Sequence, residues 1–171
     1  NDDDGTYTLS LKVDAHGRNV SETNKANVLF VVDTSSSMRH PTSTTPPSNR
    51  IIDTHDAVLT IGDKLLAYNN THPNAVEVAM IAFDGDVYER LDWTDDKTEF
   101  DSKVNTYLAY YYMHQGTDWE DSMKAALQKL ATDTDDDPTF VVFFTDGEPS
   151  QYTSFMGAAE NVKDDHGDPL N

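Results

Sequence analysis

The sequence contains no cysteine, and this absence excludes a disulfide framework, a thiolate nucleophile and a cysteine-based zinc site. Long apolar runs are also missing, because no stretch approaches the roughly 20 residues that a membrane-spanning helix needs. Positive charge is scarce: 12 Lys and Arg stand against 31 Asp and Glu, which leaves a formal net charge of −19. Such a surface repels nucleic-acid phosphates and anionic lipids, so we expect no nucleic-acid partner and no direct membrane binding.

The sequence does contain enough apolar material for one globular domain. Its 171 residues are 37% hydrophobic and 25% charged, which is the composition of a folded chain rather than a disordered one. Its acidity is typical of proteins in an extracellular or high-salt setting. Residues 6–13 alternate polar and apolar with the period of a half-buried strand, and the polar stretch after them indicates a linker. We therefore predict an N-terminal strand and linker over 1–25 and the main domain over 26–171.

Apolar runs and helical patterns alternate through the main domain. Residues 28–33 (VLFVVD) and 139–146 (TFVVFFTD) are apolar runs that end in an acid, typical of strands covered on both faces. Residues 76–83 and 87–91 flank the turn DGD and predict an antiparallel hairpin. Helical spacing predicts four helices, over 51–66, 98–111, 117–130 and 155–162.

Capping residues and breakers set the expected boundaries of these elements. Thr98 is expected to cap the second helix, and Thr117 with Glu120 forms a predicted capping box at the start of the third. Residues 39–50 are rich in proline and hydroxyls, which indicates a surface loop. Together these elements predict a three-layer α/β sandwich with a doubly wound, mostly parallel sheet and one antiparallel edge strand.

Oxygen-bearing side chains follow the predicted strands where ligands bind in such sheets, beyond the carboxyl ends. Carboxylates and hydroxyls are hard ligands, so they suit Mg²⁺ best, with Mn²⁺ or Ca²⁺ as alternatives to it, and not zinc or copper. Because alternate residues point the same way after the first strand, its serines can face one ion while Thr34 and Ser36 turn aside. The candidate metal ligands are Asp33, Ser35, Ser37, Thr117 and Asp146.

Three short motifs resemble those of the von Willebrand factor type A domain. DTSSS at residues 33–37 matches the family's D-x-S-x-S element, GT at 116–117 is similar to its threonine-bearing loop, and TDGE at 145–148 is similar to its third loop. Together these elements form the family's metal-ion-dependent adhesion site. The resemblance covers about residues 26–165 and follows the family's order of elements.

The resemblance implies a role for each candidate ligand. Ser35, Ser37 and Thr117 would coordinate the ion through their hydroxyls, and Asp33 and Asp146 would act directly or through water. The sixth position would be left to water or to a carboxylate of the partner. The implied function is adhesion without catalysis, with a protein partner such as a host extracellular-matrix or cell-surface glycoprotein.

Two longer stretches, GTDWEDSMKAAL and VVFFTDGEP, most resemble the domains of Gram-positive surface and pilus-tip adhesins. This resemblance implies an extracellular protein, held at the cell surface or cell wall by an anchor outside this segment, and an adjoining β-rich module that supplies the first strand. The family normally continues with two more strands and a helix. We therefore expect the segment to be truncated at its C-terminus, with an open sheet edge beside residues 139–146.

Several other side chains are expected near the site without binding the ion. Tyr112 and His114 precede the threonine loop, and His40 begins the loop expected to overhang the same rim. Glu148 is expected to be solvated or to support the ligands from behind. We group these four residues as the ligand-binding rim.

Two other classes of function compete with adhesion. One is a metal-bound structural or assembly subunit, in a pilus or scaffold. The other is a metal-assisted hydrolase, or a serine hydrolase built on the serines of residues 35–37 with His40 as the only nearby base. The sequence lacks a G-x-S-x-G elbow, a phosphate-binding G-x-x-x-x-G-K-[ST] loop and an H-E-x-x-H pair. We therefore predict that the protein is not an enzyme.

Overall fold

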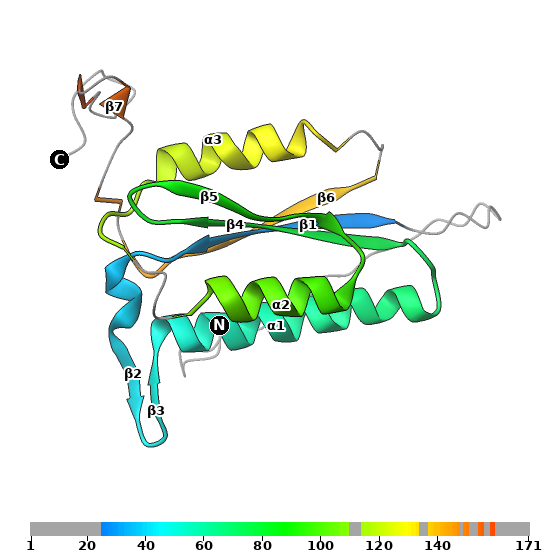
Figure 1. The fold of residues 1–171 in the computed structure, drawn as a ribbon, viewed down its shortest axis with the longest axis horizontal. Coiled ribbons are helices and arrows are strands. Elements are labelled where there is room, and N and C mark those ends of the chain that lie inside the picture. The colour runs from blue at the N-terminus through cyan, green and yellow to red at the C-terminus, as the bar shows by residue number, and fades with distance from the viewer. Residues whose placement is uncertain are drawn as a thin grey trace, which may run out of the picture.

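A four-stranded sheet forms the centre of the domain, in the order β5-β4-β1-β6. The computed structural model describes residues 25–109, 114–133, 137–147, 149–150, 154–155 and 158–159. Strands β4, β1 and β6 are parallel, and β5 is antiparallel to β4 at one edge (Figure 1). The strands are β1 (Ala26–Asp33), β4 (Val76–Phe83), β5 (Val87–Thr94) and β6 (Thr139–Phe144).

Helices cover both faces of this sheet, so the sheet is the middle layer of a three-layer sandwich. Helices α1 (Arg50–Ala67) and α2 (Lys97–Tyr107) lie on one face, and α3 (Trp119–Leu130) lies on the other (Figure 1). The predicted mostly parallel α/β fold with one antiparallel edge strand is confirmed. None of the described helices is long and apolar enough to cross a bilayer.

Strand β1 is central because its side chains are apolar on both faces. Val28, Phe30 and Val32 pack with α1 and α2, whereas Leu29 and Val31 pack on the side of α3. Burial of each such side chain contributes about 1.5–3 kcal/mol to folding. A strand of this kind is stable only in the interior of the sheet, with a neighbour on each side and a helical layer on each face.

The register of the parallel strands brings three loops to one end of the sheet. Asp33 pairs with Phe83 of β4, and Val32 pairs with Phe144 of β6. The chain segments that leave these strands therefore begin at the same level. This shared edge positions the candidate ligands that follow β1 and β6, whereas Thr117 lies just before α3.

Several predicted boundaries differ from the structure. The stretch expected to be a surface loop, residues 39–50, contains an exposed hairpin, because its prolines still allow a short pairing, and a 3₁₀ helix ends at Arg39. Asp96, and not Thr98, caps α2, since its carboxylate accepts from the backbone amides of Thr98 and Glu99. The added elements are η1 (Ser36–Arg39), β2 (Pro41–Thr44), β3 (Pro47–Asn49) and η2 (Tyr68–Asn70).

The predicted last helix is wrong where it can be compared. Ser154–Phe155 (β7) and Ala158–Ala159 (β8) pair as two antiparallel strands, so hydrogen bonds between segments replace the helical pattern inferred from apolar spacing. Residues 1–24 with the predicted first strand, and residues 160–171, lie outside the described residues. The domain boundaries at both ends therefore stay predictions.

The two helices on the same face approach each other closely at Gly62 of α1. A Cβ atom added at Gly62 would lie 2.2 Å from both Cε1 and Cζ of Phe100 in α2. Phe100 is fully buried, and its ring centroid lies 5.9 Å from that of Phe30 in β1. The ring therefore has little room to move away from a larger residue at position 62.

We predict that Gly62→Ala destabilises the domain. Helix propensity alone would favour alanine by about 1 kcal/mol, but the clash with Phe100 should outweigh it and lower the free energy of unfolding by about 1–3 kcal/mol. Urea denaturation of the variant checks this. The same change in a Phe100→Leu background should cost less, and an equal cost in both backgrounds would show that the ring is not the cause.

Candidate metal centre

The carboxylate of Asp33 lies at the end of β1 and is fully buried. Its Oδ1 accepts a hydrogen bond from the backbone amide of Ser35 at 2.7 Å, and its Oδ2 accepts one from Thr145 Oγ1 at 2.7 Å. Burial raises the pKa of Asp33, although the hydrogen bonds from Ser35 and Thr145 act in the opposite direction. A cation beside this carboxylate would favour its ionised form.

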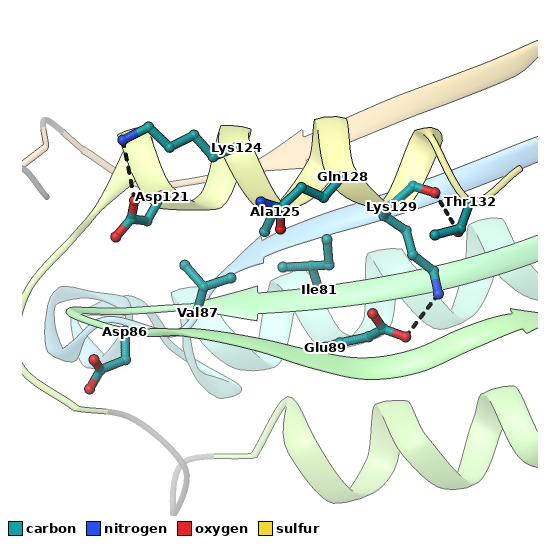
Figure 2. A pocket seen from close by; sticks show the side chains of 10 residues that line it. All are labelled: Ile81, Asp86, Val87, Glu89, Asp121, Lys124, Ala125, Gln128, Lys129 and Thr132. Carbon is teal, nitrogen blue, oxygen red and sulfur yellow. Dashed lines mark hydrogen bonds and ion pairs between the residues drawn. The ribbon is translucent and has the colours of Figure 1, made fainter. Parts of the chain in front are cut away.

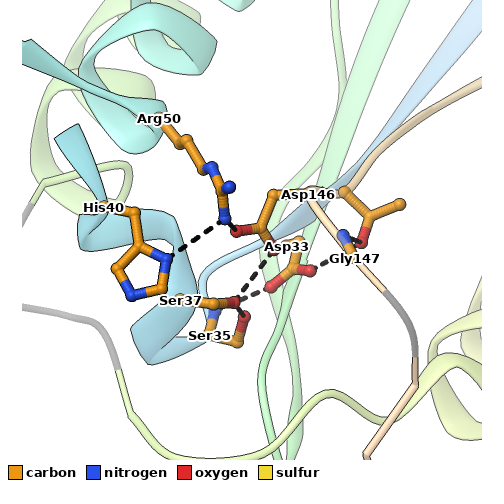
Figure 3. A network of polar contacts seen from close by, with 8 residues as sticks. Asp33, Ser35, Ser37, His40, Arg50, Asp146 and Gly147 are labelled. Atoms are coloured by element: carbon orange, nitrogen blue, oxygen red, sulfur yellow. Dashed lines mark hydrogen bonds and ion pairs between the residues drawn. The ribbon is translucent and has the colours of Figure 1, made fainter. Parts of the chain in front are cut away.

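The serine hydroxyls of the first loop connect the ends of β1 and β6. Ser35 Oγ lies 3.0 Å from Ser37 Oγ, and Ser37 Oγ donates to Asp146 Oδ1 at 2.9 Å (Figure 3). Thr34 does turn aside, because its hydroxyl donates to the backbone oxygen of Phe83 at 3.1 Å. The hydroxyl of Thr34 thus has a structural role, whereas that of Ser37 bonds Asp146 and that of Ser35 bonds Ser37. Ser36 was also expected to turn aside, but it lines the same pocket as Ser35 and Ser37.

One pocket brings four of the five candidate ligands together. Its volume is about 320 Å³, and Ser35, Ser37, Thr117 and Asp146 line it. Asp33 does not line the pocket; it lies behind the serines and supports the loop through the amide of Ser35. The geometry therefore places hydroxyls at the front of the site and one carboxylate behind them.

The backbone of the second loop is held in place by its neighbours. Ser150 N donates to Thr117 O at 3.0 Å, and Asp118 N donates to Asp84 O at 2.7 Å. Gly116 has a φ of 99°, a value that a residue with a side chain adopts only with strain. This conformation turns the chain into the pocket immediately before Thr117.

The predicted capping box is wrong by one residue. The cap of α3 is Asp118, whose Oδ1 accepts from the amide of Asp121 at 3.0 Å. Thr117 therefore does not have to serve both as a helix cap and as a ligand. Among the described residues, its hydroxyl makes no hydrogen bond in this structure, which leaves its lone pairs available in the pocket.

Arg50 is the main feature of the site that the sequence did not suggest. Its Nη1 forms an ion pair with Asp146 Oδ2 and lies 3.4 Å from His40 Nδ1 (Figure 3). Arg50 N also donates to His40 O at 3.1 Å, which closes the base of the β2-β3 hairpin. The hairpin brings residues ten apart into contact, and no short motif signals that contact.

The described rim residues make their contacts beside the predicted ligands. His114 Nδ1 lies 2.9 Å from Oδ2 of the buried Asp84, and its backbone pairs with that of Ser35. His40 contacts Arg50, as described above. Tyr112 and Glu148 lie outside the described residues.

Asp84 could have been found from the sequence by the rule that found Asp33, because it also follows a buried strand. From the sequence, Asp84 was assigned only to the predicted turn DGD, so its contact with His114 was not predicted. Its Oδ1 accepts from the amide of Asp86 at 3.0 Å, while Oδ2 holds His114. Asp84 therefore supports the rim through His114.

A second pocket adjoins the first and shares its residues Ser36 and Gln115. Its volume is about 650 Å³, and its lining includes positively charged, negatively charged and aromatic side chains. This pocket extends the concave surface beyond the candidate ligands. Its other lining residues are Arg39, Asp86, Tyr88 and His114.

A third pocket, of about 540 Å³, lies between α3 and β5 (Figure 2). Lys129 is buried there, and its Nζ lies 2.8 Å from Glu89 Oε1 and also pairs with Asp92. These ion pairs join α3 to the edge strand. No predicted ligand lines this pocket, so its charges serve the packing of the two elements.

The donor set of the candidate site fits a hard divalent cation. Over residues 25–109, 114–133 and the shorter described stretches, no group of three or more Asp, Glu or His side chains is placed to hold a metal. The pocket instead combines Asp146 with the hydroxyl-bearing residues Ser35, Ser36, Ser37, Thr117 and Ser150. Asp33 lies behind the serines of the first loop. Such oxygens match the ligands that Mg²⁺ and Mn²⁺ take, with water in the remaining positions.

Comparison with known families identifies the domain type. A family model of the von Willebrand factor type A domain matches residues 28–148. A search of curated proteins found no match for this chain.

Solved structures share the fold. The von Willebrand factor domain of the type V pili tip protein Mfa5 from Porphyromonas gingivalis has a TM-score of 0.63 at 22% identity, over 77% of this chain and 41% of that chain. The PilB minor pilin from Streptococcus sanguinis has a TM-score of 0.63 at 15% identity, over 76% and 31%. The pilus adhesin SpaC from Lactobacillus rhamnosus GG has a TM-score of 0.60 at 20% identity, over 78% and 16%. The chain thus spans less than half the length of each.

We predict that Asp118→Ala lowers the free energy of unfolding in EDTA by about 1 kcal/mol, because α3 loses its cap. Asp118→Asn should restore most of this stability, since asparagine caps equally well and burial already raises the pKa of Asp118. Thr117→Val, which removes only the hydroxyl, should cost less than Asp118→Ala. Urea denaturation measures all three, and a larger cost at Thr117 would support the capping box instead.

Proposed function

Because this chain belongs to the von Willebrand factor type A domain family, we propose that it is an adhesion module that binds an acidic group of a protein partner through a divalent cation. The observation that carries this proposal is the pocket in which Ser35, Ser37, Thr117 and Asp146 meet. These residues come from three loops that are far apart in the sequence. Such convergence of ligand-type oxygens is what a metal-bridged contact requires.

The charge balance of the site supports an anionic partner. The two positive charges of a dication beside Asp33 and Asp146 would be balanced by one negative charge from each carboxylate, because the hydroxyl ligands are neutral. The loaded site would therefore be close to neutral, on a chain whose formal net charge is −19. A cation in this setting attracts an external carboxylate to its vacant coordination position.

The adjoining pocket supports a partner that extends beyond one carboxylate. Arg39 and Tyr88 line it next to the candidate ligands, and they offer a charged donor and an aromatic surface. A protein surface with an acidic residue at its centre suits these features. We propose a surface location and a host extracellular-matrix or cell-surface glycoprotein as the partner.

A hydrolytic function would need a base beside one of the serines. The described contact of His40 is with Arg50, and His114 is held by Asp84. Ser37 donates its hydrogen bond to Asp146, a carboxylate that also bears the Arg50 ion pair. These contacts favour a binding site over a catalytic one.

An assembly subunit is the second candidate, and a different surface favours it. Phe140 and Val141 of β6 are 56% and 41% exposed. β6 is the last strand of the four-stranded sheet, so this side offers an edge strand and apolar side chains to a neighbouring subunit. Association through this surface would not depend on a cation.

We predict that Mg²⁺ or Mn²⁺ raises the melting temperature of the wild-type domain over that in EDTA. At a hundredfold excess over Kd, binding stabilises the folded state by about 2.7 kcal/mol, which corresponds to several degrees. Ser37→Ala and Asp33→Ala should remove most of this increase. Ser102→Ala is the control, because it removes an exposed hydroxyl of α2 that lines neither the candidate site nor the adjoining pocket. Equal increases in all four proteins would reject the site.

We predict that the Mn²⁺-loaded domain binds at least one member of a panel of host glycoproteins and that EDTA releases it. Ser37→Ala should lose this binding, and Ser102→Ala should keep it. Surface plasmon resonance measures both. Binding that persists in EDTA would favour the assembly subunit, and metal-dependent turnover of an ester or phosphate would favour an enzyme.

A further inference from the structure

Arg50 forms an ion pair with Asp146, the carboxylate that the proposed cation would also bind. Its Nη1 pairs with Oδ2 of Asp146, whose side chain is only 7% exposed, and Arg50 itself lines the pocket (Figure 3). His40 Nδ1 lies 3.4 Å from the same guanidinium nitrogen. The arginine is thus held from two sides at the entrance to the candidate site.

The position of Arg50 in α1 gives no local reason for an arginine there. It is the first residue of α1, where the positive end of the helix dipole disfavours a cationic side chain. The cap of this helix is Asn49, whose side chain accepts from the amide of Ile52 at 3.0 Å. The contact that offsets the unfavourable position is the ion pair with Asp146.

Both oxygens of Asp146 already have partners in this structure. Oδ1 accepts from Ser37 Oγ, and Oδ2 accepts from Arg50 Nη1. The serine hydroxyl can rotate and offer its lone pairs to a cation, but a guanidinium has donors only. Arg50 therefore cannot join the ligands, and its charge repels a dication.

We propose that Arg50 is an internal competitor of the cation, so that loading of the site and release of Arg50 from Asp146 are one exchange. This inference rests on the proposed function, because it concerns the same site. When no cation is bound, the side chain of Arg50 would then neutralise the charge of Asp146. The exchange also makes Arg50 the residue that sets the cation affinity.

Binding of Mn²⁺ to wild type, Arg50→Met and Lys64→Met tests the exchange. Isothermal titration calorimetry, with electron paramagnetic resonance of free Mn²⁺ as a second method, gives the affinities. Arg50→Met should bind Mn²⁺ about threefold to tenfold more tightly than wild type, because the competing ion pair is lost. Lys64→Met is the matched control: it removes one positive charge from the same helix about 20 Å away, so its affinity should stay within about twofold of wild type.

Thermal unfolding gives a readout that does not depend on a partner. In EDTA, Arg50→Met should melt below wild type, because the metal-free fold loses the ion pair. In saturating Mn²⁺ the two melting temperatures should converge, since wild type has already released Arg50. Arg50→Lys, which keeps the charge without the fork of donors, should fall between them and provides a test if Arg50→Met does not fold.

The outcomes separate this inference from the proposed function. Equal Mn²⁺ affinity in wild type and Arg50→Met, or weaker binding by the variant, would overturn the competition while the metal site stands. Weaker binding would assign Arg50 the opposite role, that of orienting Asp146 for the ion. Absence of Mn²⁺ binding in both proteins would overturn the metal site and the exchange with it.

Discussion

The complete burial of β1 between two parallel neighbours is the constraint on which the rest of the structure depends. Its side chains alternate between the layer of α1 and α2 and the layer of α3, so no residue of the strand can reach solvent until the strand ends. Asp33 is the first polar residue at that end, and it is still fully buried. Its position is therefore determined by the packing of the whole domain and not by the loop that follows it.

A short chain of hydrogen bonds links the buried end of β1 to the other side chains of the candidate site. Asp33 holds the amide of Ser35 and the hydroxyl of Thr145, and the hydroxyls of Ser35 and Ser37 lead to Asp146. The chain connects the loop after β1 with the loop after β6. Because each group is hydrogen-bonded to the next, the oxygens of the two loops are held close together.

The electrostatics of the site differ from those of the surface around it. The domain is strongly acidic, yet Arg50 and Arg39 line the two pockets at the carboxyl end of the sheet. A buried carboxylate whose pKa is raised by desolvation, next to one that is paired with arginine, makes the site less negative than its two acids suggest. The local charge thus differs from the net charge of the chain, and it is the local charge that a ligand meets.

Much of this architecture follows from features that the linear sequence displays. The continuous apolar runs at 28–33 and 76–83 require buried strands, and acids and hydroxyls at their ends require a polar edge, because neither group is stable in the other's environment. Helix caps were harder to predict. Thr117 and Asp118 both suit a cap, and the structure uses Asp118, whose amide also donates to Asp84 O in another loop.

The contact of Arg50 with Asp146 could not be predicted from the sequence. The two residues are 96 positions apart, and they meet only because a hairpin returns the chain to His40 while β6 runs parallel to β1. The kinds of residue and their order along the chain determined the layers, the strands and the set of candidate ligands, since these depend on local hydrophobicity and spacing. Partner choice and charge compensation within the site depend on distances between remote segments, and those distances exist only once the chain has folded.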